Sequence, residues 1–370
     1  MESRIVIKRI VRILICIIIS IFLFIHLTYI FREPLSHTRE HLCGFYSEEK
    51  NTVDVAIIGT SCTFSAIAPM KMWEDHGIAA YNFCTNVMLG NTMRYAMKEI
   101  EKTQSPKLYI IDIASFMNGY VVTDAQAGTP QDNQILRYNT DGFRLSLNRL
   151  DLINEVVLDR KKRINYYLDL LYYHSNPNPE PEYWNYDKAS AYKGYSNLQV
   201  DVMFDEKYSA EDYEIQPVSL SLEEMEILDS LLICIQEQKA RVLFIVGPYW
   251  RIDKTEEARI KAAGKALFIK DYLKEKGYDF LDLHEHIEEI GMNGAQDYSM
   301  DYNHYTITGA LKNTQYLGSY IMKEYDLPDR RNDAGYDKWR SEYKEWTETI
   351  LPDNIAWTER LRQEYIDNHN

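Results

Sequence analysis

The sequence predicts an α/β fold: a three-layer, doubly wound parallel sheet of about five strands, with an N-terminal transmembrane helix and a mostly helical insertion. Short apolar runs alternate with segments of helical period, which is typical of a parallel sheet with covering helices. The run at 107–113 is apolar nearly throughout, as expected of a strand covered on both faces. A third observation, the apolar stretch at 13–31, predicts the membrane helix.

The composition of the 370 residues is that of a folded chain, and it disfavours nucleic acid as a partner. Hydrophobic residues make up 45% and aromatic residues 13%, enough to bury a core. A nucleic-acid binder needs a basic face, whereas the net charge here is −15. The five cysteines show no CxxC or Cys/His ligand spacing, which argues against a disulfide scaffold and a structural zinc site. We expect neither a metal nor a cofactor.

The N-terminal segment has the pattern of an uncleaved membrane anchor. Its 19 residues, 13–31, rise about 1.5 Å each as a helix and nearly match a bilayer core of about 30 Å. Four basic residues precede it, namely Arg4, Lys8, Arg9 and Arg12. The positive-inside rule therefore places 1–12 in the cytoplasm and the rest of this single-pass protein outside the cell membrane. The alternative, a cleaved signal peptide, would have a shorter apolar region and a small-residue cleavage site, which 29–34 lacks.

After a polar juxtamembrane connector at 32–52, an α/β domain is expected at 53–325. Its strands are predicted at 53–59, 78–83, 107–113, 241–248 and 278–283. Its helices are predicted at 70–76, 92–102, 221–239, 255–276 and 309–325. Pro69 suits the start of the first of these helices, and Ser221 is a suitable N-cap for the third.

The alternation stops in the middle of the domain, which predicts an insertion at 118–220. Residues 145–171 have helical spacing and include the basic run 160–163, which is interpreted as a solvated helix face. Three prolines at 176–184 exclude a helix there and indicate an exposed loop. The charged tail at 326–370 is expected to pack on the outside as helices.

Two polar stretches follow predicted strands and together contain the groups that acyl transfer needs. Ser61 comes after the first strand, and Asp301-Tyr-Asn-His304 follows the fifth. Carboxyl ends of parallel strands meet at one edge of a sheet, so both stretches return to the same edge. A serine nucleophile needs a base, a group that orients the base, and donors for the oxyanion. Taken singly, Ser61 also fits a helix cap, and the second stretch also fits a turn.

Three blocks of residues resemble the SGNH (GDSL-like) hydrolase superfamily. They are Ile58-Gly-Thr-Ser61, Tyr81-Asn-Phe-Cys-Thr-Asn86 and Asp301-Tyr-Asn-His304-Tyr-Thr-Ile-Thr-Gly309-Ala, and the resemblance extends over roughly 50–325. The membrane anchor and Tyr192-Lys-Gly-Tyr195 are similar to bacterial cell-surface members. Those members include the teichoic-acid D-alanyl transfer protein and polysaccharide O-acetyltransferases.

The resemblance implies roles for individual residues. Ser61 would be the nucleophile, His304 the general base and Asp301 its orienting partner. The family's second block offers an amide to the oxyanion, and Cys84, Thr85 or Asn86 stands in that region here. The asparagine of the family's third block is not evident, and the nearest candidates are Ser115 and Asn118.

Further candidates for the site stand out by residue type and position. Lys193 and Tyr195 suit an anionic or sugar substrate and equally suit a turn, whereas Tyr249 and Trp250 follow the fourth strand and suit the lining of a cleft. His284 and His286 pair with no third metal ligand, which favours a surface helix. Cys62 is interpreted as a small apolar residue rather than a thiol nucleophile.

These observations predict a membrane-anchored extracellular acyl-ester transferase or esterase acting on cell-surface polysaccharide or teichoic acid. The resemblance implies a glycan or polyol substrate and a multi-pass membrane acyltransferase as a partner. One alternative is a catalytically inactive, SGNH-like glycan-binding module of a cell-envelope acylation system. Another is a nucleotide or flavin binder, because Thr60-Ser-Cys-Thr63 faintly resembles a phosphate loop, although it lacks the glycines of one.

Overall fold

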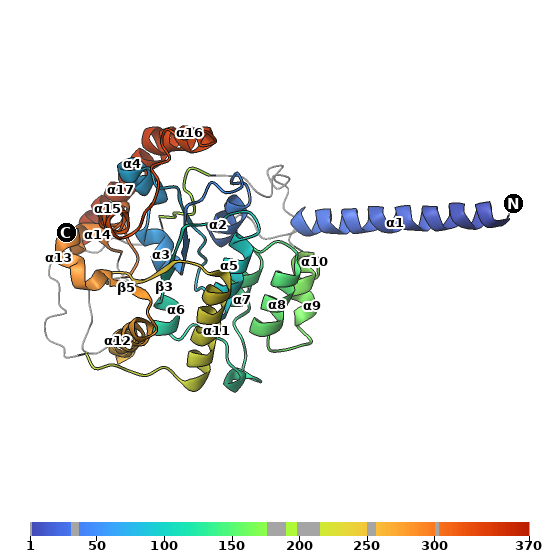
Figure 1. Ribbon diagram of the computed structural model, residues 1–370, viewed down its shortest axis with the longest axis horizontal. Helices are drawn as coiled ribbons and strands as arrows, with labels where there is room; N and C mark the ends of the chain where they lie inside the picture. The colour runs from blue at the N-terminus through green and yellow to red at the C-terminus, as the bar shows by residue number, and fades with distance from the viewer. Residues whose placement is uncertain are drawn as a thin grey trace.

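The computed structural model shows an α/β domain from which one long N-terminal helix projects (Figure 1). The residues it describes are 2–30, 37–175, 190–197, 215–249, 257–299 and 303–369. The proline-containing loop expected at 176–184 lies outside these residues.

Five strands form one parallel sheet in the order β2-β1-β3-β4-β5. They are β1 (Val55–Ile58), β2 (Ala80–Asn82), β3 (Leu108–Asp112), β4 (Val242–Val246) and β5 (Asp279–Asp282). In this doubly wound order, β2 is added on one side of β1, and β3, β4 and β5 are added on the other side. The connections on the two sides of this switch point cover opposite faces of the sheet, which opens a crevice at the carboxyl ends of β1 and β3. The predicted α/β class and the five-stranded parallel sheet are confirmed.

Each strand is one or two residues shorter at either end than its apolar run predicts. The flanking apolar residues are buried but leave the hydrogen-bonded ladder. Val53, Phe83 and Ile113, for example, are at most 2% exposed although none belongs to a strand. Burial of side chains therefore continues past the points where strand pairing ends.

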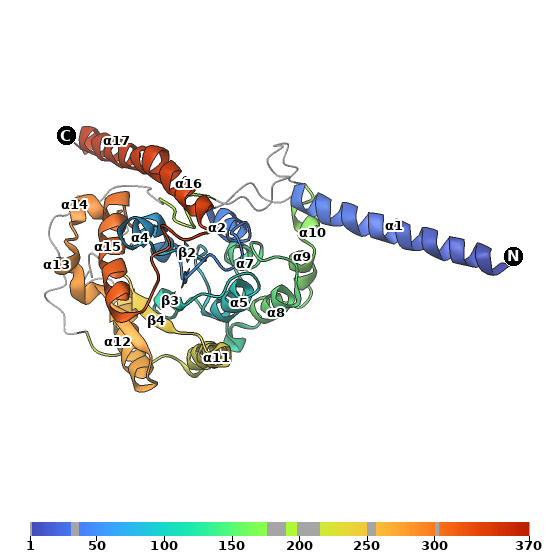
Figure 2. The ribbon, with the colours of Figure 1, turned by 45° about the horizontal axis from the view of Figure 1, so that its top comes forward.

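Helices cover both faces of the sheet. Ile58 and Ile111 enter one apolar cluster, while their neighbours Ile57 and Ile110 enter a second cluster on the other face. Helices α5 (Gly90–Ile100), α11 (Leu222–Gln238) and α12 (Glu257–Glu275) contribute to the first cluster, and α15 (Ile307–Glu324) contributes mainly to the second. Figure 2 shows α5 and α11 on the opposite side of the strands from α4 and α15.

The remaining elements are mostly short helices. They are α2 (His37–Phe45), α3 (Ser61–Ala66), α4 (Pro69–His76), α6 (Ala114–Met117), η1 (Asp124–Gln126), α7 (Asn133–Thr140), α8 (Leu147–Val156), α9 (Arg163–Tyr167), α10 (Asp169–Tyr173), η4 (Leu283–His286), α13 (Ile287–Ile290), α14 (Gly294–Asp297), α16 (Asp337–Glu345), η5 (Trp346–Ile350) and α17 (Leu351–His369).

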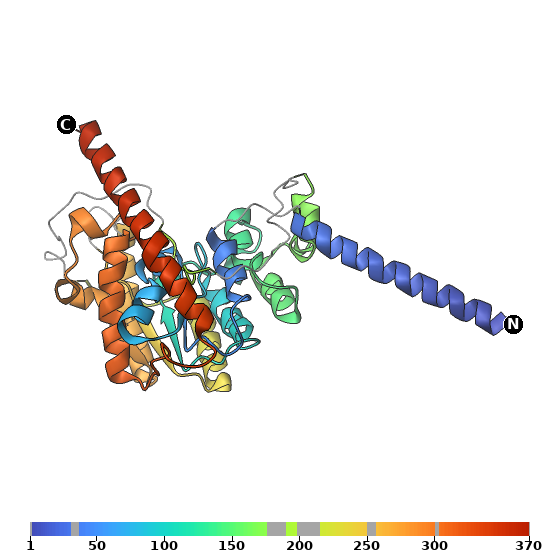
Figure 3. The ribbon, with the colours of Figure 1, turned by 90° about the horizontal axis from the view of Figure 1, so that it is seen from above.

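The N-terminal helix α1 (Glu2–Ile30) is long and apolar enough to cross a membrane over Arg4–Thr28. No residue of its most apolar window is buried against the domain, and α1 extends away from it in Figures 1–3. The expected connector at 32–52 is wrong in part, because 37–45 form α2. Leu42 and Phe45 of α2 are fully buried, since a short apolar period within this polar stretch packs into the core.

The helical spacing expected at 145–171 is confirmed in part, but the basic run at 160–163 lies mostly in a turn and not on a helix face. Helical structure is interrupted at Val157 and Leu168, whose backbone dihedral angles lie outside the helical region. The segment therefore forms three short helices, α8, α9 and α10. In the charged tail, Trp339 and Trp346 are each 1% exposed and pack into the core. The tail is therefore helical as expected, but its start belongs to the domain interior.

A buried ion cluster holds the helices of the insertion together. Asp169 on α10 accepts hydrogen bonds from Arg149 on α8 at 2.9 and 3.0 Å and from Arg137 on α7 at 3.2 Å. All three residues are at most 4% exposed. Removing the Asp169 carboxylate would leave the two buried guanidinium groups with only Asp141 as a shared counter-charge, at 3.1 Å from Arg137 and 3.9 Å from Arg149.

We therefore predict that Asp169→Ala lowers the free energy of unfolding by roughly 3–5 kcal/mol. Urea denaturation of the full chain in detergent, followed by tryptophan fluorescence, measures this. Asp151→Ala on the exposed side of α8 is the matched control and should change the value by less than about 0.5 kcal/mol. Equal effects of the two substitutions would contradict the prediction.

Candidate functional site

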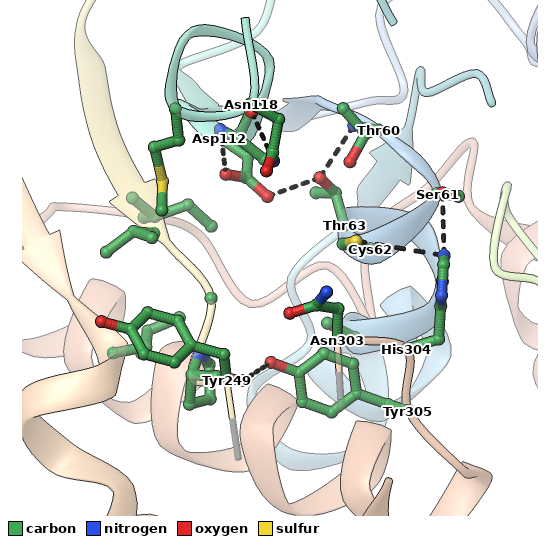
Figure 4. A pocket seen from close by; sticks show the side chains of 18 of the residues that line it. Thr60, Ser61, Cys62, Thr63, Asp112, Asn118, Tyr249, Asn303, His304 and Tyr305 are labelled. Carbon is green, nitrogen blue, oxygen red and sulfur yellow. Dashed lines mark hydrogen bonds between the residues drawn. The ribbon is translucent and has the colours of Figure 1, made fainter. Parts of the chain in front are cut away.

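A cavity of about 310 Å³ lies at the carboxyl ends of β1, β3 and β4. Its walls come from the start of α3, from α6, from α12, from η4 and from the residues just before α15 (Figure 4). This is the position where doubly wound sheets bind ligands, because the helices on either side of the chain reversal separate there. The sheet therefore brings together segments that are far apart in the sequence.

Ser61 and His304 meet in this cavity. Ser61 is the first residue of α3, and its Oγ lies 2.8 Å from Nε2 of His304, three residues before α15. This distance is within the range that proton transfer from a nucleophile to a base requires. Figure 4 shows the two side chains pointing toward each other. The structure thus joins the two stretches that the sequence analysis singled out.

Contacts between α15 and the α3–α4 segment set this approach. Asn313 Nδ2 donates a hydrogen bond to the carbonyl of Ala66 at 3.0 Å, and Thr314 Oγ1 accepts one from the amide of Ala68 at 2.9 Å. Both α15 side chains are fully buried. Thr306 caps α15 by accepting from the amide of Gly309. The start of α15, and with it His304, is therefore held against α3.

The predicted orienting residue, Asp301, lies outside the described residues. What the structure describes is the support on the other side of His304. The carbonyl of His304 accepts a hydrogen bond from the amide of Ser299 at 2.9 Å, and Tyr305 forms an antiparallel bridge with Tyr298. The role of Asp301 stays a prediction from the Asp-x-x-His spacing.

Cys62 offers a second nucleophilic atom near the same imidazole. Its Sγ lies 3.9 Å from His304 Nε2, and the residue lines the cavity. The shorter contact belongs to Ser61 Oγ. The interpretation of Cys62 as only a small apolar residue therefore overlooked its position beside the base.

A buried carboxyl group, Asp112, was missed by the sequence analysis. It ends β3, lines the cavity and accepts hydrogen bonds from Thr63 Oγ1 at 2.7 Å and from the amide of Ala114 at 2.8 Å. Thr63 Oγ1 in turn accepts from the amide of Thr60 at 3.0 Å. This chain of hydrogen bonds ties the turn that presents Ser61 to the end of β3. The signal available beforehand was an acidic residue at the end of an apolar strand.

Gly59 is required by the same arrangement. A Cβ atom at this position would lie 2.1 Å from Thr63 Oγ1, closer than any real contact. The first turn of α3 therefore packs directly on the backbone at the end of β1. Any larger residue would displace Thr63 and break its link to Asp112.

Burial raises the pKa of Asp112 from its usual value near 3.8 to about 6, and the hydrogen bonds from Thr63 and Ala114 partly oppose this.

On the far side of the cavity, Tyr249 stacks on His284 with ring centroids 3.7 Å apart. Burial lowers the pKa of His284 to about 4, so this imidazole is neutral at pH 7.

Of the oxyanion candidates, Asn118 lines the cavity, whereas Thr85 and Ser115 do not. The Nδ2 of Asn118 donates to the carbonyl of Ala114 at 2.9 Å with a second proton left on the amide. Thr85 is not available as a donor: it is fully buried, its amide donates to the carbonyl of Gly59 at 3.3 Å, and its hydroxyl donates to the carbonyl of Tyr138. Ser115 is equally buried and donates to the carbonyl of Met88.

Asn86 is half-buried and is not among the described residues that line the cavity, whereas the next residue, Val87, is. Val87 has a φ of +47°, a left-handed conformation that a β-branched residue rarely adopts. Asn139 accepts a hydrogen bond from the amide of Leu89 and donates one to the carbonyl of Val87. The second block thus reaches the cavity through Val87, one residue beyond the predicted positions. Such strain is stored where the surrounding structure imposes it, often at functional sites.

Two predicted substrate contacts are wrong. Lys193 is fully buried, and its Nζ lies 2.7 Å from Glu48 and 2.6 Å from Glu342. Tyr195 is 1% exposed and packs edge-on against Trp346. Both residues join the 190–197 segment to the start of the tail rather than lining the cavity. Their polar and aromatic character serves the domain interior.

Of the other two candidates, Tyr249 lines the cavity and Trp250 lies outside the described residues. Asn303 and Arg259 also line the cavity and were not singled out. Among the residues that the structure describes, no cluster of three or more His, Cys, Asp or Glu side chains could hold a metal ion.

Comparisons with known proteins identify no family for this chain. A scan against protein-family models matches no family, and a search of the curated proteins matches no sequence. Support for a function therefore comes from the site itself.

The raised pKa of Asp112 predicts a pH dependence of stability. The folded state holds the proton of this group up to about pH 6, whereas the unfolded state releases it near 3.8. The stability it contributes is thus fully present below about pH 4 and is lost as the pH rises toward 6. Asp112→Asn removes this loss, so we expect the unfolding free energy of the variant relative to the parent to rise by about 2 kcal/mol between pH 4 and pH 6.5.

Urea denaturation at a series of pH values measures this difference. Asp337→Asn, at a side chain that is 93% exposed, is the control and should show no such trend. A variant-to-parent difference that stays constant across this pH range would show that Asp112 is not buried as a neutral acid.

Proposed function

We propose that this chain is a membrane-anchored acyl-ester transferase or esterase of the SGNH (GDSL-like) type, with Ser61 as nucleophile and His304 as general base. The observation that carries the proposal is the 2.8 Å contact between Ser61 Oγ and His304 Nε2 at the carboxyl edge of a parallel sheet. A serine hydroxyl is a weak nucleophile at its free pKa, and a base at this distance activates it.

The proposed reaction has two halves. Ser61 Oγ attacks the acyl carbonyl while its proton passes to His304 Nε2. The ester C–O bond then breaks, and the proton passes from Nε2 to the leaving oxygen. This leaves an acyl-Ser61 ester, whose carbonyl a sugar or polyol hydroxyl, or water, attacks while His304 takes the proton of the attacking group. The bond between the acyl carbon and Ser61 Oγ then breaks, and the proton passes from His304 Nε2 back to Ser61 Oγ, which releases the new ester or the free acid. Asp301 would orient the ring and stabilise its charged form.

Candidate donors for the oxyanion stand beside Ser61. As the first residue of α3, Ser61 has a backbone N–H without an acceptor in its own helix. The amide of Asn118 borders the same cavity. Loss of one such donor typically costs about 100- to 1000-fold in rate, so their position relative to the carbonyl matters.

The proposed place of action is the outer face of the cell membrane. The basic residues before the apolar part of α1 support an N-terminus in the cytoplasm. Transfer to a cell-surface glycan or teichoic acid, with a multi-pass membrane acyltransferase as the source of the acyl group, rests on the family resemblance of the three blocks.

A second candidate function is a binding module that holds a glycan without turnover. Asp112 favours it, because a carboxylate borders the cavity after β3, where the resemblance calls for an amide donor. Glycan binding that survives His304→Ala, together with no turnover of any ester by the parent chain, would support this alternative.

We predict that Ser61→Ala lowers kcat/KM for hydrolysis of p-nitrophenyl acetate at least about 100-fold, because the nucleophile is lost. Cys62→Ala is the matched control at the next residue and should stay within about threefold of the parent, because the thiol is farther from the base. Full-length chains in detergent are compared. The reverse pattern would make Cys62 the nucleophile, and no loss in either variant would sink the proposal.

A second prediction concerns the acyl group. Beyond Ser61 the cavity is lined mainly by apolar side chains, among them Met117, Val246 and Ala263, which suits an acyl chain. Ala263→Leu fills part of this space. It should lower kcat/KM for p-nitrophenyl butyrate about tenfold and leave the acetate ester within about threefold, because only the longer chain reaches the substituted wall.

Ala258→Leu, on the exposed side of the same helix, is the control and should change neither rate. Near-UV circular dichroism checks that both variants are folded. An equal loss with both esters would show that this part of the cavity does not hold the acyl chain.

A further inference from the structure

The insertion helices α9 and α10 lie where the membrane helix meets the domain. Helix α1 ends at Ile30 and α2 begins at His37, and the six residues between them span at most about 25 Å. Because Leu42 and Phe45 of α2 are fully buried, the domain must stay within that reach of the end of α1. Helix α1 also packs against α10. In Figures 1–3, α8, α9 and α10 form the rim of the domain nearest to α1.

This rim exposes both apolar and basic side chains. Ile164, Leu171 and Tyr172 are 46%, 46% and 45% exposed. The turn before α9 adds three exposed cations, Arg160, Lys161 and Lys162. We refer to these six residues as the juxtamembrane face. Single exposed apolar residues are common, but these three lie on two consecutive short helices that contact each other, and α10 also contacts α1.

The charge of this face differs from that of the chain. The net charge of the whole chain is −15, whereas residues 159–163 contain four cations against one acid, Asp159. Clustered Lys and Arg next to a membrane helix are attracted to anionic lipid headgroups. Tyrosine side chains are enriched at the same depth, because their rings are apolar and their hydroxyls are wet. The composition therefore fits the surface of a bilayer.

The face is built on a rigid support. The guanidinium group of Arg137 lies 4.1 Å from the ring centroids of both Tyr166 and Tyr172. Asp169 joins α10 to Arg149 and Arg137 through the buried ion cluster. The exposed side chains of α10 are thus presented by a fixed helix and not by a loose loop.

We propose that the juxtamembrane face lies against the surface of the bilayer that α1 spans. Ile164, Leu171 and Tyr172 enter the headgroup region, and Arg160, Lys161 and Lys162 contact anionic lipid phosphates. The face fixes the tilt of the domain on its anchor. Helices α12 and α15, which border the cavity, lie at the end of the domain away from α1 (Figures 1 and 2). The cavity is thereby held off the bilayer, whatever reaction it performs.

The test uses the full chain in lipid nanodiscs. A nitroxide label is attached to Leu171→Cys in a background with Cys16→Ser and Cys62→Ala, which removes the two non-buried native thiols. Power saturation compares the label's access to oxygen, which concentrates in lipid, with its access to a water-soluble nickel chelate. The control label is placed at Leu222→Cys, an 84% exposed leucine at the start of α11, away from α1 in Figure 1.

In nanodiscs that contain phosphatidylglycerol, we expect the oxygen-to-nickel accessibility ratio at position 171 to exceed that at position 222 several-fold. Replacing the anionic lipid with phosphatidylcholine should lower the ratio at 171 and leave position 222 unchanged. In nanodiscs that contain phosphatidylglycerol, the exposed triple variant Arg160→Glu, Lys161→Glu, Lys162→Glu should likewise lower the ratio at position 171 and leave position 222 unchanged.

Equal ratios at positions 171 and 222 in anionic nanodiscs would overturn the proposal. So would a high ratio at 171 that responds neither to lipid charge nor to the triple variant, because protein rather than lipid would then cover the face. Near-UV circular dichroism of the triple variant confirms that it is folded.

Discussion

The pairing of β1 between β2 and β3 is the constraint on which the site depends. The register sets Ile58 opposite Ile111, so that Gly59 and Asp112 leave their strands at the same level. All four residues of β1 are fully buried, as expected of a central strand covered by helices on both faces. The hydrogen bonds from Thr63 to Asp112 and from Thr60 to Thr63 then connect the two strand ends. Ser61 is presented by the turn that this link holds.

The other half of the site arrives through helix packing. Asn313 and Thr314 lie on the buried side of α15 and bind the backbone around α3 and α4. Their hydrogen bonds satisfy backbone groups that burial would otherwise leave unpaired. This fixes the start of α15 beside the start of α3. The contact between His304 and Ser61 is therefore a consequence of how two helices share one face of the sheet.

The residues outside the site show how polar side chains can serve the domain interior. Lys193 has a left-handed backbone with a φ of +48°, and its ammonium group bridges Glu48 and Glu342 beneath the ring of Trp339. Three segments widely separated in the chain meet at this one buried charge. A buried lysine needs such partners, because burying a charge without them is very costly. The same requirement explains the cluster of Asp169 with its two arginines, which holds α10 in place beside α1.

The sequence by itself determined the strands, most of the sheet-covering helices and an N-terminal helix that is apolar enough to span a membrane, because each follows from a local period or run of apolar residues. It also singled out Ser61 and His304, whose side chains the structure brings to 2.8 Å of each other. Only the tertiary structure decided which polar residues converge. Asp112 and Val87 border the cavity, whereas Thr85, Lys193 and Tyr195 are buried elsewhere. The physical reason is that burial and charge pairing of a polar side chain depend on residues distant in the chain, and no local period records them.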